Sequence, residues 1–305
     1  MARPIEADVV LACGEHLPAV DVWMVIDVLR ATSVIVRWFE LGGGDLYPVE
    51  SVAEARRLAR DLAAGGAGKR PLLMGEENAI PPQGFDLGNS PLDLTREVVQ
   101  AHPCAVMATS NGTVALLAAA ATGAPVVAAC VRNASAALDY ALSIGPRLGL
   151  LCAGRRRRPA WDDTLCAGLI LNELQTRRPG LLLADSARLA LLAWQGSGDI
   201  ESSMRSSDHA VFLDRIGYGA DIAFACQQDA ASLVPVLHEE PEGDGMRAVL
   251  RAVPGAPRPR PGRAPVQPSP EETPLLLRAQ PEASGQHFFL SGDARRRADK
   301  KLDLS

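Results

Sequence analysis

The sequence predicts an α/β protein with a three-layer α/β/α arrangement, a largely parallel or mixed sheet and a proline-rich C-terminal tail. Between residues 104 and 175, apolar runs typical of strands alternate with segments of helical spacing, a pattern that favours a parallel sheet with helices on both faces. A continuous apolar run at residues 22–26 ends at Asp27 and predicts a buried strand. After His238 the apolar content falls and prolines accumulate, which marks the start of the tail.

The elements of the N-terminal part follow from local signals. The predicted strands cover 5–11, 22–26, 46–49 and 72–74, and the predicted helices cover 33–41, 52–64 and 90–101. The first helix should stop at the glycines of residues 42–44, because glycine favours helix C-termini. The third helix should begin at Ser90, since serine is a good N-cap and Pro91 suits the first helical position.

The second half contains three strand–loop–helix units in close succession. Their strands are predicted at 104–108, 125–130 and 148–152, and their helices at 114–121, 134–143 and 162–175. Further helices are predicted at 186–195 and 203–216, with a last short strand at 233–237. The loops inside the three units are polar, so side chains capable of chemistry follow each strand.

We expect one α/β domain over residues 1–238 and a C-terminal extension over residues 239–305. Eight prolines lie between Pro254 and Pro274, with almost nothing apolar among them. Such a segment cannot bury enough apolar surface to offset the entropy lost on ordering, so the extension is expected to be extended or disordered.

Composition restricts the class of protein. A net charge of −5 and 4% aromatic residues give no basic, aromatic surface of the kind that binds nucleic acid. The longest apolar candidate, residues 114–131, is interrupted by Thr122 and Pro125, so no membrane span is expected, and the first residues do not resemble a signal peptide. The six cysteines are scattered and form no Cys-x-x-Cys pair, which favours buried free thiols in a reducing cytoplasm.

Four polar clusters fall where predicted strands end or predicted helices begin. The first cluster joins Asp27 and Arg30 to the hydroxyls of Thr32 and Ser33. A carboxylate, a guanidinium and a helix N-terminus suit a metal ion beside a phosphate. A capped turn with a local Asp–Arg pair explains the same residues, so this cluster alone leaves both interpretations open.

The other three clusters have similar positions. They are Glu76 with the loop 84–91, which contains Asn89 and Ser90; the loop Thr109, Ser110, Asn111, Gly112 and Thr113; and Arg132 with Asn133 beside the pair Asp162 and Asp163. Each is also explained as a helix cap, a turn or a complement to a helix dipole. Because the carboxyl ends of parallel strands meet at one edge of a sheet, the clusters together indicate a site for magnesium and a phosphorylated ligand.

Strings of residues in these clusters resemble the 2-phosphosulfolactate phosphatase family. They are Asp27-Val-Leu-Arg-Ala-Thr, Gly84-Phe-Asp-Leu-Gly-Asn-Ser-Pro91, Thr109-Ser-Asn-Gly-Thr113, Arg132-Asn133, Ala153-Gly154, Asp163-Thr-Leu-Cys-Ala-Gly168 and Ser207-Asp-His209. They occur in order over roughly residues 6–237. The resemblance implies a three-layer fold, a homodimer, and a magnesium-dependent phosphatase that converts 2-phospho-3-sulfolactate to 3-sulfolactate and phosphate in coenzyme M biosynthesis. The chain departs from the family at Gly75-Glu76-Glu77, where the family usually has Gly-Glu-Arg.

These patterns assign hypothetical roles. The candidate catalytic residues are Asp27, Arg30 and Asp163. The candidate magnesium ligands are Asp27, Glu76 and Asp163, with Asp162 as the alternative. The candidate substrate-binding residues are Thr32, Ser33, Asn89, Ser90, Thr109, Ser110, Asn111, Gly112, Thr113, Arg132 and Asn133. Arg30 and the 109–113 loop would hold the phosphoryl oxygens, and Arg132 would pair with a carboxylate or sulfonate of a small phosphorylated hydroxy acid.

The sequence leaves several alternatives open. The attacking group is either water or Asp27 itself. Cys152 and Arg158 have the Cys-x5-Arg spacing of a cysteine phosphatase, although the arginines between them and the proline that follows disfavour that chemistry. His209 is expected to be structural or a helix cap rather than a general acid, and the run 155–158 a solvated loop rather than an electrostatic funnel for a polyanion. A phosphatase for another phosphorylated 2-hydroxy acid, and a non-catalytic anion-binding protein, remain as alternative functions.

Overall fold

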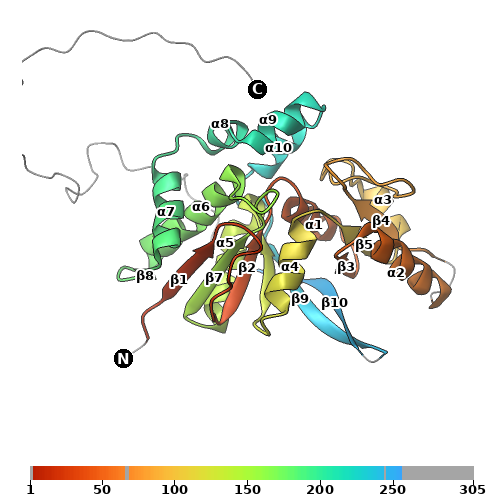
Figure 1. The fold of residues 1–305 in the computed structure, drawn as a ribbon, viewed down its shortest axis with the longest axis horizontal. Coiled ribbons are helices and arrows are strands. Elements are labelled where there is room, and N and C mark those ends of the chain that lie inside the picture. Colours follow the sequence, from red (N-terminus) through yellow and green to blue (C-terminus); the bar gives the residue numbers. More distant parts are fainter. Residues whose placement is uncertain (1–2, 66–68, 244, 256–305) are drawn as a thin grey trace, which may run out of the picture. The chain divides into compact units, whose positions relative to one another are not determined.

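The structure is a computed structural model that describes residues 3–65, 69–243 and 245–255 (Figure 1). Its strands are β1 (Glu6–Val10), β2 (Val22–Ile26), β3 (Leu46–Val49), β4 (Leu72–Gly75), β5 (Ala105–Ala108), β6 (Val126–Ala129), β7 (Arg147–Cys152), β8 (Leu182–Leu183), β9 (Leu233–Glu242) and β10 (Gly245–Pro254). Its helices are α1 (Ala31–Glu40), α2 (Val52–Gly65), α3 (Arg96–Ala101), α4 (Gly112–Ala120), α5 (Ala134–Ile144), α6 (Trp161–Arg177), α7 (Asp185–Gln195), α8 (Ile200–Arg205), α9 (Asp208–Arg215) and α10 (Gly219–Ala225), with a short 3-10 helix η1 (Val131–Asn133).

The strands of the described chain form one sheet in the order β4-β5-β3-β10-β9-β6-β2-β7-β1-β8. Strands β6, β2, β7, β1 and β8 pair in parallel, and we call them the large block. Strands β3, β5 and β4 also pair in parallel, and we call them the small block. The antiparallel hairpin of β9 and β10 lies between the two blocks. The predicted α/β fold with a largely parallel sheet is therefore confirmed.

The two blocks run in opposite senses, because three antiparallel pairings separate β6 from β3. The strand pairing between β10 and the small block is a single residue pair, Leu250 with Leu46 of β3. Helix α4, which follows β5 of the small block, packs against β2 and β7 of the large block. The loop before α4 thereby reaches the end of β2: a Cβ atom on Gly112 would lie 2.6 Å from Asp27 Oδ2. The strand ends meet as predicted, but through this packing rather than along one edge of a parallel sheet.

Strand β2 lies at the centre of the core, and all five of its residues are buried. Met24 and Ile26 belong to a core cluster with α5 and α6, whereas Trp23 and Val25 belong to a second cluster with α1 and α4. Because successive side chains of a strand point to opposite faces, helices must cover both faces of the sheet here. This is the predicted three-layer arrangement. In the small block, α2 packs Ala55, Leu58 and Ala59 against β3 and β5.

Two helix predictions are wrong at their boundaries. The helix expected from Ser90 begins at Arg96, where the Thr95 side chain accepts a hydrogen bond from Val98 N. The Ser90 hydroxyl instead donates to Asp221 Oδ1 at 2.7 Å. The helix expected over 203–216 is divided into α8 and α9, because Ser207 caps a new helix by accepting from Ala210 N. Local capping signals are correct in kind, but tertiary partners decide which of them is used.

The C-terminal part of the sheet is longer than predicted. Strand β9 continues beyond residue 237 to Glu242, and β10 returns beside it over ten residue pairs. The domain boundary expected at residue 238 therefore falls inside β9, and the first compact unit of the chain includes the whole hairpin. Strand β8 and helix α10 were also not predicted. The proline-rich segment expected to be extended or disordered lies, from residue 256 onward, outside the described residues.

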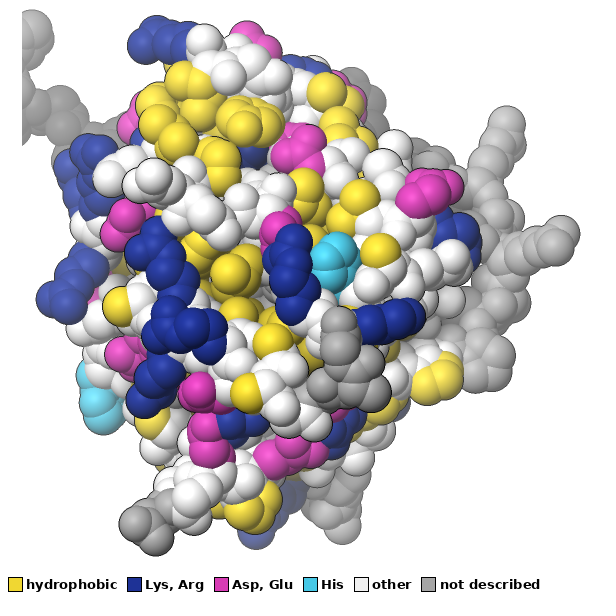
Figure 2. Space-filling view, turned by 90° about the vertical axis from the view of Figure 1, so that its right-hand side faces the viewer, with side chains coloured by type: hydrophobic (Ala, Val, Ile, Leu, Met, Phe, Trp, Pro, Cys, Tyr) yellow, Lys and Arg dark blue, Asp and Glu magenta, His cyan; other side chains and the backbone are white. Residues whose placement is uncertain are grey.

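The burial of the cysteines and the mixture of charges on the surface are typical of a globular protein. All six cysteines are free, and four of them are buried, as their apolar surroundings predict. None of the helices in the described ranges is both long and apolar enough to span a membrane. On the face seen in Figure 2, basic side chains are mixed with acidic ones.

Candidate active site

The turn between β2 and α1 fixes the position of Asp27. The Thr32 hydroxyl accepts from Asp27 N at 3.1 Å and donates to Asp27 O at 2.7 Å. The Ser33 hydroxyl donates to Val28 O at 2.8 Å. Ala31 N donates to Asp27 Oδ1 at 3.2 Å, so one carboxylate oxygen is held by the helix N-terminus. Thr32 and Ser33, predicted to touch substrate, are fully buried and instead hold the backbone that presents Asp27.

Arg30 is buried beside Asp27 and connects three segments. Its Nη1 donates to Asp221 Oδ2 at 2.9 Å, and its Nη2 donates to Ala79 O at 3.3 Å. Its guanidinium lies 4.3 Å from the centre of the Tyr218 ring. A guanidinium has five N–H donors, so these two bonds leave donors for a ligand. Ser90, a predicted substrate contact, supports this ion pair through its bond to Asp221.

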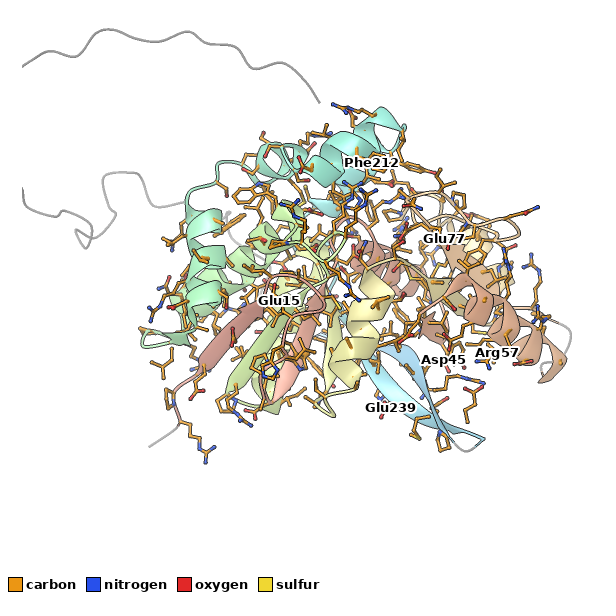
Figure 3. The ribbon with its side chains drawn as sticks, viewed as in Figure 1. Glu15, Asp45, Arg57, Glu77, Phe212 and Glu239 are labelled. Carbon is orange, nitrogen blue, oxygen red and sulfur yellow. The ribbon has the colours of Figure 1, made fainter. Side chains whose placement is uncertain are left out.

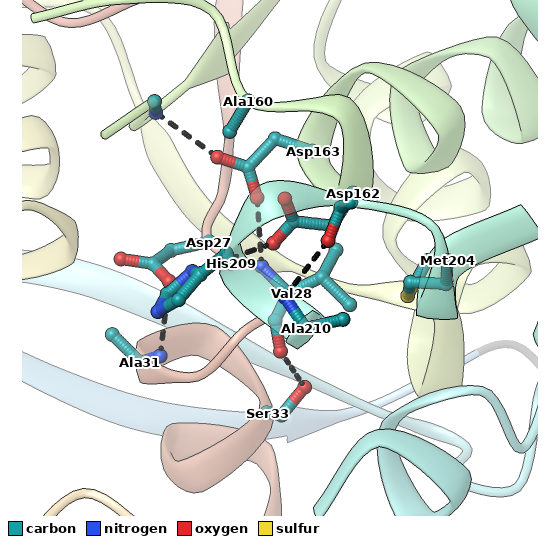
Figure 4. Close-up of polar contacts among 12 residues, drawn as sticks. Asp27, Val28, Ala31, Ser33, Ala160, Asp162, Asp163, Met204, His209 and Ala210 are labelled. Atoms are coloured by element: carbon teal, nitrogen blue, oxygen red, sulfur yellow. Dashed lines mark hydrogen bonds and ion pairs between the residues drawn. The ribbon is translucent and has the colours of Figure 1, made fainter. Parts of the chain in front are cut away.

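Two acidic residues at the start of α6 lie next to the Asp27 turn (Figure 4). Asp163 Oδ1 accepts from Val28 N at 2.9 Å and its Oδ2 accepts from Gly154 N at 3.0 Å. Asp163 therefore ties the end of β2 to the end of β7. The Oδ1 atom of Asp162 is buried without a hydrogen-bond partner among the described residues, and its Oδ2 lies 3.8 Å from His209 Nδ1.

Burial and mutual repulsion change the proton affinity of these acids. Burial raises the pKa of Asp27 to about 6, with the nearby charges of Asp162 and Glu76 acting in the same direction and His209 against it. Burial, Asp162 and Asp27 also raise the pKa of Asp163 well above its ordinary value. Acids with shifted pKa values in a cavity are typical of functional sites. A cation or a positively charged ligand group beside them would relieve the repulsion.

The small block supplies the opposite wall. Glu76 accepts from Ala79 N at 2.6 Å and from Ser110 N at 2.7 Å, so it holds two loops together. The hydroxyls of Thr109 and Thr113 bond to each other and to the local backbone. These two threonines are buried and stiffen the start of α4. Within the predicted loop 109–113, the residues that reach the cavity are Ser110 and Asn111.

A polar cavity of about 90 Å³ lies where the two walls meet. Its lining comprises Asp27, Leu29, Arg30, Glu76, Asn78, Ala79, Asn89, Ser110, Asn111, Arg155, Arg156, His209 and Phe212. The Oδ1 atom of the predicted residue Asn89 is buried there without a hydrogen-bond partner in the described part of the chain. Polar side chains crowd the space between Phe212 of α9 and the turn that carries Glu77 (Figure 3). The cavity brings Asp27, Arg30, Glu76 and Ser110 together, as the sequence predicted.

Arg132 and Asn133 lie elsewhere. Arg132 donates to both carboxylate oxygens of Glu40, to Gln227 Oε1 and to Phe224 O. Asn133 donates to Ala128 O and Leu233 O and accepts from Cys130 N. Neither residue lines the cavity. Arg132 instead has a structural role, because both terminal nitrogens of its guanidinium bond to protein oxygens and its Nε, which has no partner among the described residues, is buried away from the cavity.

Arg155, Arg156 and His209 line the cavity, although their sequence context predicted a solvated loop and a structural histidine. The two arginines directly follow Gly154, at the end of β7, and His209 lies in the first turn of α9. The arginines follow a strand and His209 begins a helix, and these positions are the sequence signal that could have predicted them as site residues.

The cysteine phosphatase alternative fails. Cys152 is fully buried, and burial with the neighbouring charge of Asp163 raises its pKa well above the ordinary value. Because the thiolate is the nucleophilic form, a buried thiol of this kind is inert. The Cys-x5-Arg spacing to Arg158 is therefore coincidental.

The acidic residues are compatible with a magnesium ion held by one or two carboxylates, not with a closed cage of protein ligands. Within the described ranges, no three His, Cys, Asp or Glu side chains form a group able to hold a metal ion. The predicted set of Asp27, Glu76, Asp163 and Asp162 is therefore not assembled as a closed cage, and both oxygens of Glu76 and Asp163 already accept backbone N–H groups. Magnesium commonly uses one or two carboxylates and completes its shell with water and substrate phosphate. The orphaned Asp162 Oδ1 and the cavity-lining Asp27 are compatible with that arrangement.

The family model and the similar proteins carry the same family description. The family model for 2-phosphosulpholactate phosphatase matches residues 12–240. A probable 2-phosphosulfolactate phosphatase of Deinococcus radiodurans is 36% identical over 226 residues, which is 73% of this chain and 89% of the relative. Proteins with the same description from Pseudothermotoga lettingae and Thermus thermophilus are each 34% identical, over 76% and 73% of this chain and 96% and 91% of the relatives. The chain belongs to the 2-phosphosulfolactate phosphatase family.

Proposed function

We propose that the protein is a phosphoric monoester hydrolase that releases phosphate from 2-phospho-3-sulfolactate or a similar phosphorylated 2-hydroxy acid. Family membership supports the reaction class. The observation that carries the proposal is one shared cavity. Asp27, whose pKa is raised to about 6, lines it together with the buried guanidinium of Arg30 and with Ser110 and Asn111. A carboxylate, a cation and polar donors from separate elements are what transfer of a phosphoryl group requires.

In this proposal the phosphoryl group occupies the 90 Å³ cavity. Arg30 binds its oxygens with the N–H donors that Asp221 and Ala79 leave unused. Ser110 and Asn111 contact it from the small block. Because Asp27 and Arg30 are buried, their charges act more strongly than they would in solvent, and the cationic and polar groups stabilise the charge that spreads over the phosphoryl oxygens in the transition state.

Magnesium is part of the proposal. Asp27 and Asp162 are the residues proposed to hold it, since Glu76 and Asp163 already use both oxygens to position loops. The ion would supply charge neutralisation for the phosphate ester. Glu76 and Asp163 are then positioning residues that fix the two walls. The homodimer implied by the family resemblance stays a prediction.

The identity of the attacking oxygen has a direct test. Direct attack of water on phosphorus breaks the ester bond in one displacement and inverts the configuration at phosphorus. Attack by Asp27 forms an aspartyl phosphate, which water then hydrolyses, and the two displacements retain the configuration. A chiral, isotopically labelled phosphate ester therefore distinguishes the two routes.

The reaction is tested with the purified full-length chain. Phosphate release is measured from 2-phospho-3-sulfolactate, 2-phospholactate and phosphoglycolate, with magnesium and with EDTA. We expect phosphate release that requires magnesium, with the highest rate for one of the three phosphorylated acids. If the esters bind but release no phosphate under either condition, the chain is a non-catalytic anion-binding protein.

A further inference from the structure

The arginine run 155–158 forms a tight two-residue turn. Arg155 and Arg158 exchange backbone hydrogen bonds of 2.9 and 3.1 Å, and the two residues between them have φ of 53° and 59°. Positive φ at both central positions is the geometry that Asn and Gly favour. An arginine there is strained, because its Cβ approaches the following carbonyl oxygen. Strain of this kind is retained where a side chain serves a function, so the direction of each arginine is informative.

The side chains of this turn point to different places. Arg155 stacks on the Phe212 ring, 4.8 Å from its centre, and both Arg155 and Arg156 line the cavity that also contains Asp27. Arg157 instead lies against the Cys13–Gly14 segment: a Cβ atom on Gly14 would be 3.8 Å from its Cδ, and its charge acts on the Cys13 thiol. In the described part of the chain, neither Arg155 nor Arg156 forms an ion pair with a carboxylate. Two guanidinium groups thus line a cavity whose acidic residues, Asp27 and Glu76, form no ion pair with them in the described part of the chain.

A second, larger cavity adjoins the first. It has a volume of about 460 Å³ and is lined by Arg155, Arg156, Arg158, Trp161 and His209, with the carboxylates of Asp162 and Asp208 on its wall. Arg155, Arg156 and His209 belong to both linings. The shared residues therefore form the boundary between a compartment of phosphate size and one that has room for the rest of an ester.

We propose that Arg156 is a specificity-determining residue that recognises a second acidic group of the substrate, a carboxylate or a sulfonate, held at the boundary with the larger cavity. The inference rests on the proposed phosphatase function and names its substrate class: phosphate esters with a further anionic group near the ester carbon. A guanidinium matches a carboxylate or sulfonate with two parallel hydrogen bonds. Arg156 thereby takes the role that the sequence assigned to Arg132, whose guanidinium is bound by Glu40.

The test uses a matched pair of substrates and a matched pair of variants. 2-Phospholactate and isopropyl phosphate differ by one carboxylate in place of a methyl group. Arg156→Gln removes the proposed contact, and Arg157→Gln removes the same charge from the next position of the same turn. The kcat/KM for the phospholactate, divided by that for isopropyl phosphate, should fall about ten- to a hundredfold in R156Q, mostly because KM rises for the carboxylate-bearing ester. In R157Q this ratio should change less than about twofold, and R156K should recover part of the loss.

Each other outcome is decisive. An unchanged ratio in R156Q, or an equal fall in R157Q, overturns the inference, because the run then acts only as a diffuse positive field. If the wild-type protein hydrolyses neither these two esters nor 2-phospho-3-sulfolactate, the proposed function fails, and calorimetry with 2-phospholactate as the titrant decides the inference separately. Weaker binding to R156Q than to R157Q then supports the role of Arg156, and equal binding overturns it.

Discussion

A buried arginine lies at each end of helix α1, and the two have different uses: Arg30 directly precedes the helix, and Arg132 of η1 bonds to Glu40, its last residue. At the N-terminal end, Arg30 stacks on Tyr218 and makes two hydrogen bonds to protein oxygens. At the C-terminal end, Arg132 stacks on Phe224 and makes four, two of them to Glu40. The first lines the cavity and the second does not. A buried guanidinium is available to a ligand only where its unused N–H donors reach a cavity, as those of Arg30 do and the unpartnered Nε of Arg132 does not.

The acids at the two ends differ in the same way. Glu40 is paired with Arg132, and its side chain keeps some contact with solvent. Asp27 has one backbone N–H donor and repulsive neighbours, and its pKa is raised to about 6. Pairing stabilises a buried acid, whereas an unpaired one lowers the stability of the fold. The N-terminal end of α1 therefore holds an unpaired acid at the site where we propose the reaction, whereas the C-terminal end holds a paired one.

Exchanging one acid at each end gives the largest expected contrast. Asp27→Asn should lower kcat at least about a thousandfold, because it removes the charge at the centre of the cavity. Glu40→Gln, the control at the other end, should leave kcat within about twofold. Steady-state phosphate release and circular dichroism of both variants make the measurement. Equal losses in the two variants would show that α1 affects activity only through the fold.

The pH dependence of stability sharpens the contrast. Because the folded state raises the pKa of Asp27 from 3.8 to about 6, it holds the proton more tightly than the unfolded state. The free energy of unfolding should therefore fall, by about 2 kcal/mol, as pH rises from 4 to 7. Urea unfolding in EDTA should show this fall in the wild type and a smaller one in D27N. Parallel profiles for the two proteins would contradict the raised pKa.

Replacing each arginine by lysine separates an effect on activity from one on stability alone. Arg30→Lys should reduce kcat/KM about ten- to a hundredfold, since one ammonium cannot replace the planar guanidinium, and should also lower the free energy of unfolding by about 1–2 kcal/mol, since it weakens the buried bonds to Asp221 and Ala79. Arg132→Lys should leave kcat/KM nearly unchanged and lower the free energy of unfolding by about 1–2 kcal/mol. Kinetics and urea unfolding of both variants test this. A loss of kcat/KM in R132K but not in R30K would return Arg132 to the substrate site.

Magnesium binding should give the smallest effect, a rise in Tm that depends on Asp27 at the N-terminal end of α1. At about ten times its Kd, the ion should raise the Tm of the wild type by about 4 °C. The shift should vanish in D27N and persist in E40Q. Thermal unfolding with magnesium and with EDTA measures it without reference to activity. A full shift in D27N would place the ion away from Asp27.

The sequence predicted the alternation of strands and helices well, because hydrophobic periodicity and capping are local signals. It missed the hairpin insertion, since the pairing of β10 with β3 depends on contacts about 200 residues apart in the chain, such as Leu250 with Leu46. The same limit applies to the site. Asp27 and Arg30 were predicted from the end of a strand and Asp163 from the start of a helix, but Arg132 could not be told from Arg30, because Glu40 and Gln227 lie 92 and 95 positions away from it.

The placement of the β9–β10 hairpin has a consequence for biogenesis. Residues 233–254 are the last described strands, yet they lie in the middle of the sheet and carry the hydrogen bonds that link the two blocks. A nascent chain on the ribosome can form β2 and β5 early, but it cannot seal the sheet between them until this late segment has emerged. The complete sheet, and with it the contact between the two walls of the cavity, should therefore form only after translation has passed the hairpin.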